Sequence, residues 1–159
     1  MALRKIRTEE DPVLKKVSKK VEVFDSRLHM LLDDMKDTLI KADGVGLAAV
    51  QIGILKRVVL IDVGDEHGFI EAINGEIIDR KGEQREIEGC LSLPEKSGIT
   101  SRPMYVKFKA QDRNGEWFEV EGEELMARCF CHELEHLDGH LYTEKMDRFL
   151  TEEELNMED

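Results

Sequence analysis

The chain has 159 residues, enough for one domain with a buried core, and we expect a single domain over residues 1–159. Acidic residues exceed basic ones by 35 − 23 = 12, which argues against nucleic acid as an electrostatic partner. No apolar run approaches the roughly 18 residues of a membrane span. The N-terminus lacks the apolar segment of a signal peptide, and three cysteines suit free thiols or metal ligation better than disulfides. We therefore expect a cytoplasmic protein.

The first two elements predicted along the chain are helices. Residues 11–18 can open a short helix, with Asp11 as N-cap and Pro12 at the first position. A longer helix follows, in which Asp25 caps the start and Gly44 follows the end. Its apolar side chains recur at steps of three and four residues: Leu28, Leu31, Leu32, Met35 and Leu39.

After the glycine-rich stretch GVGLAAVQIG at 44–53, the pattern changes to strands. These are predicted at 57–62, 69–73, 76–79 and 104–110, and Asn114-Gly115 turns the chain into another at 117–122. A second long helix is expected over 123–137, stopped by Gly139. Residues 151–159 form a short acidic tail, with Thr151 and Glu154 spaced as a capping box. This order of elements indicates an α+β fold.

The second long helix carries the motif HExxH, at His132, Glu133 and His136. Residues four apart lie on one helix face, so both imidazoles can bind one metal ion while Glu133 reaches a water beside it. The alternative is a solvated face of salt bridges. Against this alternative, the same face extends back to Cys129 and Leu125 and is half apolar.

A catalytic metal needs a third protein ligand. The candidates are a distant carboxylate, Cys90, Cys129, Cys131 and His140. Cys131 points about 100° away from His132 on the helix, Cys129 lies a turn below, and His140 lies beyond Gly139. Cys90 is preferred, because Gly89 beside it permits close backbone approach. From the residues alone, a buried structural thiol stays open as the alternative role of Cys90.

Three segments together resemble the peptide deformylase family. GVGLAAVQIG is similar to its GxGxAAxQ motif, EGCLSLP to its EGCLS motif, and HELEHLDG to its HExxH segment, in the same order and at similar spacing. The resemblance reaches to about residue 150. It implies strands and small sheets packed around the C-terminal helix that carries HExxH, with the N-terminal helix outside.

The resemblance also implies a metal-dependent hydrolase that removes the N-formyl group from the N-terminal methionine of nascent chains and releases formate. By the same resemblance, Cys90, His132 and His136 hold one divalent ion, which is Fe2+ in the cell and can be Zn2+, Ni2+ or Co2+ in isolated protein. Water bound to that ion is the nucleophile, Glu133 is the general acid–base, and the Gln51 amide and Leu91 N–H stabilise the oxyanion. The alternatives are a zincin-like metallopeptidase and a non-catalytic binding protein.

The methionine side chain needs an apolar slot, for which we expect Val45, Leu125 and Cys129 as walls, while Gly46 lets the peptide backbone lie close. Glu88 and Arg102 are expected to form a buried structural ion pair. Four positions depart from the family pattern: Val50, Gly75, Cys131 and Glu135. The acidic tail differs from the basic C-terminal helix that some members use at the ribosome, so we do not expect ribosome docking by that route.

Overall fold

The computed structural model describes residues 2–157 as two antiparallel sheets and three α-helices, with three short 3-10 helices. One sheet has five strands in the order β1-β2-β3-β6-β7, and the other has three in the order β4-β5-β8. The helices are α1 (Ser26–Ala42), α2 (Leu125–Leu137) and α3 (Glu152–Met157), with η1 (Pro12–Lys15), η2 (Ala49–Ile52) and η3 (Tyr142–Glu144). The strands are β1 (Gly46–Ala48), β2 (Val58–Ile61), β3 (Ile70–Lys81), β4 (Gln84–Cys90), β5 (Leu93–Arg102), β6 (Tyr105–Gln111), β7 (Trp117–Glu123) and β8 (Met146–Phe149).

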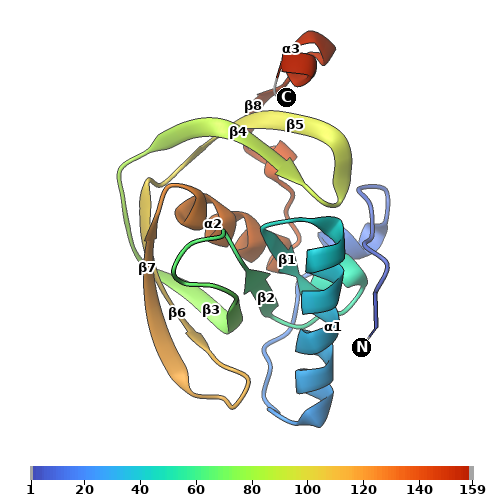
Figure 1. Cartoon of the computed structure of the whole chain (residues 1–159), viewed down its shortest axis with the longest axis vertical. Coiled ribbons are helices and arrows are strands. Elements are labelled where there is room, and N and C mark those ends of the chain that lie inside the picture. Colours follow the sequence, from blue (N-terminus) through green and yellow to red (C-terminus); the bar gives the residue numbers. More distant parts are fainter. Residues whose placement is uncertain (1, 158–159) are drawn as a thin grey trace.

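Helix α2 runs through the middle of the molecule, with the three-stranded sheet on one side and the five-stranded sheet on the other (Figure 1). Its apolar side chains, among them Met126, Phe130 and Leu137, belong to the same buried cluster as β2 and β6. The rings of Phe130 and Phe108 stack with their centroids 3.6 Å apart. The predicted α+β class is confirmed, as is the central position of the HExxH helix.

Helix α1 lies at the outside and packs its leucine stripe on β1 and β2 (Figure 1). The predicted N-cap is present, because the Asp25 carboxylate accepts a hydrogen bond from the Leu28 N–H at 3.1 Å. The helix ends at Ala42 and its C-cap is Asp43, in the left-handed conformation with φ 55°, so Gly44 follows the end as predicted. Asp11 likewise caps its helix, which is a 3-10 helix of four residues and shorter than predicted.

Several strand predictions were incomplete. The segments 69–73 and 76–79 form one strand, β3, whose register with β6 shifts between Ile73 and Glu76. Strands β1, β4, β5 and β8 were not predicted. Strand β1 has only three residues, all buried, and several buried positions of β4 and β5 hold polar residues such as Glu88, Thr100 and Arg102, so apolar alternation does not mark these strands. The second long helix begins at Leu125 rather than residue 123, since Glu123 still pairs with Tyr105 in the five-stranded sheet.

The C-terminal segment has the predicted cap. The Glu154 N–H donates to Thr151 Oγ1 at 3.2 Å, and the Thr151 N–H donates to the Glu154 carboxylate at 3.0 Å. Helix α3 projects from the body beyond β8 (Figure 1). Residues 158–159 of the predicted tail lie outside the described residues. Within residues 2–157, no helix is both long and apolar enough to cross a membrane.

Gly139 follows the C-cap of α2, has a φ of 83° and lies against the backbone of the N-terminal segment. A Cβ there would meet the Lys15 carbonyl oxygen at 2.5 Å, and a carbonyl on the backbone cannot swing aside. We predict that Gly139→Ala lowers the free energy of unfolding by about 2–4 kcal/mol, from left-handed strain plus overpacking. Chemical denaturation measures this loss.

Gly64→Ala is the matched control, because Gly64 has a similar φ of 78° but a Cβ added there would meet nothing within 4 Å. Gly64→Ala should therefore lower the free energy of unfolding only by the cost of the left-handed conformation, about 1–2 kcal/mol, with no steric clash. Equal losses in the two variants would contradict the packing argument.

Candidate active site

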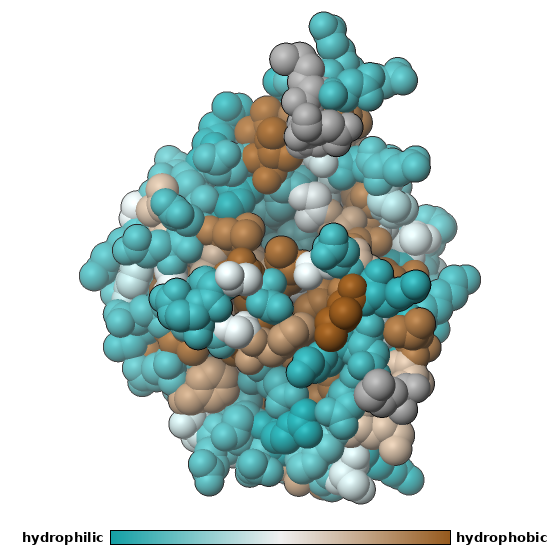
Figure 2. All heavy atoms as spheres, in the orientation of Figure 1, coloured by the Kyte–Doolittle hydropathy of each residue, from teal (hydrophilic) through white to brown (hydrophobic). Residues whose placement is uncertain are grey.

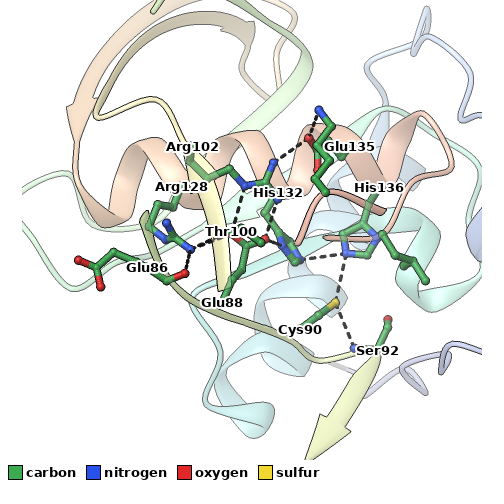
Figure 3. Close-up of polar contacts among 12 residues, drawn as sticks. Glu86, Glu88, Cys90, Ser92, Thr100, Arg102, Arg128, His132, Glu135 and His136 are labelled. Carbon is green, nitrogen blue, oxygen red and sulfur yellow. Dashed lines mark hydrogen bonds and ion pairs between the residues drawn. The ribbon is translucent and has the colours of Figure 1, made fainter. Parts of the chain in front are cut away.

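Three potential metal ligands meet at one point beside α2. The Sγ atom of Cys90 and one ring nitrogen each of His132 and His136 all lie within 4.8 Å of one another. Cys90 Sγ is 3.3 Å from His136 Nε2, which is 3.1 Å from His132 Nε2 (Figure 3). Both histidines are buried and Cys90 is half-buried. The structure thus brings together the three residues that the sequence analysis named as ligands.

This donor set suits a divalent ion. Metal–nitrogen distances of 2.0–2.1 Å and a metal–sulfur distance of 2.3 Å, in tetrahedral geometry, put ligand atoms roughly 3.3–3.7 Å apart. The observed separations of 3.1 and 3.3 Å are close to that range. Burial lowers the pKa of His136 well below its usual value, which favours the neutral imidazole that binds metals. One sulfur and two imidazoles are compatible with Fe2+, Co2+, Ni2+ or Zn2+.

Two separate elements supply these ligands. His132 and His136 are four residues apart on α2 and therefore point to the same side, as the motif spacing predicts. Cys90 is the last residue of β4, where the hairpin to β5 turns through Leu91 and Ser92. The Ser92 N–H donates to Cys90 Sγ at 3.4 Å. The turn thus presents the sulfur toward the helix.

The Glu88 carboxylate connects the two elements (Figure 3). Its Oε2 lies 2.7 Å from His132 Nδ1 and 2.7 Å from Arg102 Nη2. Burial alone would raise the pKa of Glu88, but hydrogen bonds from His132 and Arg102 lower it far below its usual value, so Glu88 is ionised. An ionised acceptor at Nδ1 directs the Nε2 lone pair of His132 toward the ligand cluster. The predicted buried pair of Glu88 and Arg102 is confirmed.

Glu133 lies one residue after the first histidine and is buried in the floor of the cavity. Burial raises the pKa of Glu133 to about 7. Its Oε1 has no hydrogen-bond partner among the described residues. A Cβ on Gly46 would meet Glu133 Oε2 at 2.7 Å and Cys129 Sγ at 2.6 Å. Close approach of β1 to α2 at this point therefore requires glycine.

Gln51 reaches the site from η2. Its Oε1 accepts from the Ala48 N–H at 2.9 Å, which fixes the amide orientation. Its Nε2 donates to Ser92 Oγ at 3.0 Å and lies 3.7 Å from Cys90 Sγ. Leu91 follows Cys90 in the same turn and lines the cavity. Both residues named for the oxyanion are thus adjacent to the ligand cluster.

A cavity of about 470 Å³ opens beside the three ligands. Figure 2 shows it as a recess on this face, below β4 and β5. It is lined by every residue that the sequence analysis assigned to the substrate: Val45, Gly46, Leu125 and Cys129. Leu125, expected on a buried face, is 45% exposed because it stands at the cavity mouth.

The other candidate ligands lie elsewhere. Cys129 is buried and its Sγ is 3.5 Å from the Val45 carbonyl oxygen. Cys131 is also outside the ligand group, and His140 is an exposed residue 3.2 Å from Glu144. Sequence reasoning missed Arg128, which is buried at the cavity wall. Its spacing of three residues from Leu125 and four from His132 was the available signal.

Comparisons with known proteins agree with this geometry. The family model described as polypeptide deformylase matches residues 3–152. The chain belongs to the polypeptide deformylase family. It is 55% identical over 155 residues to a peptide deformylase of Acetivibrio thermocellus, covering 98% of this chain and 90% of that protein. It is 48% identical to peptide deformylase 1 of Bacillus subtilis, covering 98% and 97%. A crystal structure of a Legionella pneumophila peptide deformylase superposes with a TM-score of 0.88 at 42% identity, covering 98% and 90%.

Peptide deformylases are enzymes that hydrolytically remove N-formyl groups, and this chain is a hydrolase of that class. Its departures from the family pattern leave the ligand cluster intact. Val50 is fully buried in the core, and Gly75 lies in β3 close to the Phe130 ring. Glu135 accepts from Arg102 Nη1 at 2.7 Å and pairs with Lys145.

Gly46 offers a test of how tightly the catalytic cavity is packed. We predict that Gly46→Ala lowers deformylase kcat/KM by about tenfold or more, because the new methyl group displaces the side chains of Glu133 and Cys129. A displacement of ~1 Å in a catalytic site can lower the rate up to ~100-fold. Kinetics on a formylated peptide measure it. Gly89→Ala is the comparison, since a Cβ there meets its nearest atoms only at 3.7 Å. Equal effects of the two substitutions would refute the packing argument.

Proposed function

We propose that this chain removes the formyl group from formylmethionine at the N-terminus of nascent proteins, with Cys90, His132 and His136 holding one divalent ion per chain. The observation that carries the proposal is the meeting of these three side chains beside one cavity, which Cys90, His132 and Glu133 line. Such an ion, when bound, supplies Lewis-acid chemistry that polarises a carbonyl and makes water nucleophilic near neutral pH.

Glu133 is proposed as the general acid–base. It accepts the proton of the attacking water and delivers it to the amide nitrogen that leaves. Its buried position and its Oε1 without a partner among the described residues support this role, because no group there competes for that oxygen. A site that only binds a metal for structure needs no such group.

Gln51 and the Leu91 N–H are proposed to donate to the oxygen that becomes negative as water adds to the formyl carbon. The Gln51 amide is held by Ala48 and lies beside Cys90, so its donor needs little rearrangement. The formyl carbon carries only hydrogen, and the close packing of Gly46 on Glu133 leaves little room for a larger acyl group.

The rest of the cavity is proposed to bind formylmethionine. Val45, Leu125 and Cys129 offer an apolar and polarisable surface for the thioether, and Gly46 lets the peptide backbone lie close. Because formylated chains emerge from ribosomes, we place the activity in the cytoplasm. Docking on the ribosome through the acidic helix α3 is not part of the proposal.

The decisive experiment is formate release from N-formyl-Met-Ala-Ser by anaerobically prepared, iron-loaded protein. We predict that Glu133→Ala lowers kcat by about 10²–10⁴-fold, as loss of a general acid–base does, while the variant still binds one ion. Elemental analysis measures the bound ion. Cleavage of unformylated peptides without formate release would favour a zincin-like peptidase, and neither activity would favour a binding protein.

The ion is proposed to be Fe2+ in the cell, with Zn2+, Ni2+ or Co2+ in isolated protein. We predict that a chelator abolishes formate release and that anaerobic Fe2+ restores it, because the three ligands then regain the Lewis acid. Cys90→Ser should be restored less completely, since a hydroxyl is a poorer ligand than a thiolate. Full activity of ion-free protein would contradict the proposed centre.

A further inference from the structure

Arg128 is a buried cation of α2 that the proposed reaction does not use. It is 6% exposed and lies at the cavity wall, between Leu125 and His132 on the helix. Its Nη2 has three acceptors, whereas its Nη1 is buried without a partner among the described residues. Burial of a guanidinium is unfavourable unless its contacts compensate, so the three contacts of Nη2 indicate what holds it there.

All three acceptors lie in the small sheet. Nη2 donates to Thr100 Oγ1 at 2.8 Å, to Glu88 Oε1 at 3.1 Å and to the Glu86 carbonyl oxygen at 3.2 Å (Figure 3). Glu86 and Glu88 belong to β4, the strand that ends at Cys90. Arg128 belongs to the helix of the two histidines. A single side chain therefore joins the two elements that supply the ligands.

Arg128 also determines the direction of the Thr100 hydroxyl. Because Thr100 Oγ1 accepts from Arg128, its own hydrogen is left to donate to Glu88 Oε1, at 2.9 Å. Arg102 Nε donates to the same oxygen at 3.1 Å. With three donors on Oε1, the carboxylate plane is fixed and Oε2 is held toward His132 Nδ1.

Arg102 alone does not balance the buried charge. It pairs with Glu88 and also with Glu135, so that one cation faces two carboxylates. Lys145 assists Glu135 from the exposed side, at 2.7 Å. Arg128 provides a second cation for Glu88 at 3.1 Å. Glu88 therefore has, besides Arg102, a cation of its own that Glu135 does not share.

We propose that Arg128 is a positioning residue for the metal centre, which fixes Glu88 and holds β4, and so Cys90, in register with the histidines of α2. This inference rests on the proposed metal-dependent function. Arg128 acts through Glu88 and the β4 backbone, to which its Nη2 donates. Loss of groups that orient metal ligands typically weakens metal binding by about 10–100-fold.

The test uses the whole chain loaded with Co2+, which reports ligand geometry through its visible spectrum. Arg128→Met keeps an unbranched apolar stem and removes all three contacts. We predict that it loses Co2+ to excess chelator about tenfold or more faster than the wild type, with altered absorption bands. Its kcat should fall more than its KM rises, because the ion rather than the cavity is disturbed.

Three further variants separate positioning from stability. Arg113→Met removes ion pairs to Glu71 and Asp33 away from the site, and should retain Co2+ as the wild type does. Thr100→Val removes only the hydroxyl that accepts from Arg128 and donates to Glu88. Its rate of Co2+ loss should lie between those of the wild type and Arg128→Met. Arg128→Lys keeps the charge but has fewer donors, and it should lose Co2+ more slowly than Arg128→Met does.

The outcomes distinguish the two proposals. A folded Arg128→Met protein, judged by circular dichroism, that keeps the wild-type spectrum and rate of Co2+ loss would overturn the positioning role and leave the proposed function intact. If Arg128→Met does not fold, Thr100→Val decides in the same way. Wild-type protein that takes up no Co2+ would refute the metal centre itself, and the positioning role with it.

Discussion

The carboxylate of Glu88, buried between the small sheet and α2, is the group around which the site is organised. It accepts from His132 on one oxygen and from Arg128 and Thr100 on the other, while Arg102 binds both. A buried carboxylate is stable only when its oxygens are satisfied and its charge is paired. These requirements hold β4, β5 and α2 in one relative position, which is also the position in which Cys90 meets the two histidines.

The glycine-rich segment imposes the second constraint, by close packing rather than by charge. At Gly46 the backbone of β1 approaches α2 so closely that no Cβ fits beside Cys129 and Glu133. The same segment leads into η2, which carries Gln51 to the sulfur of Cys90. The proposed general base, oxyanion donor and metal ligand are thus positioned by contacts among the consecutive elements β1 and η2, strand β4 and helix α2, which are three separate stretches of the chain.

Prediction from the sequence succeeded where a pattern is local. The leucine stripe of α1, the Asp25 cap and the four-residue spacing of His132 and His136 follow from helix geometry alone. It failed for β4 and β5, because their buried positions hold polar residues such as Glu88, Thr100 and Arg102, so that no apolar alternation marks them. It failed for β8, because the partner of that strand, β5, lies about 50 residues earlier in the chain. The predicted break between residues 73 and 76 is a further case. Asn74 there has a φ of 54°, but the strand continues, and the Asn74 side chain hydrogen-bonds to the backbone of Val21, 53 positions away.

The sequence by itself determined the composition of the site: HExxH on a helix, a cysteine beside glycine, and the motifs by which the chain resembles deformylases. It left the third ligand open among several residues, because spacing along a chain does not state which loop lies against which helix. The tertiary structure places Cys90 Sγ 3.3 Å from His136 Nε2, because the β4–β5 hairpin packs against α2, and the proposal of Cys90 as third ligand rests on this proximity. The tertiary structure also gave Arg128 a place in the site, since its acceptors on β4 and β5 lie 28 to 42 residues away and become neighbours only when the small sheet packs on α2.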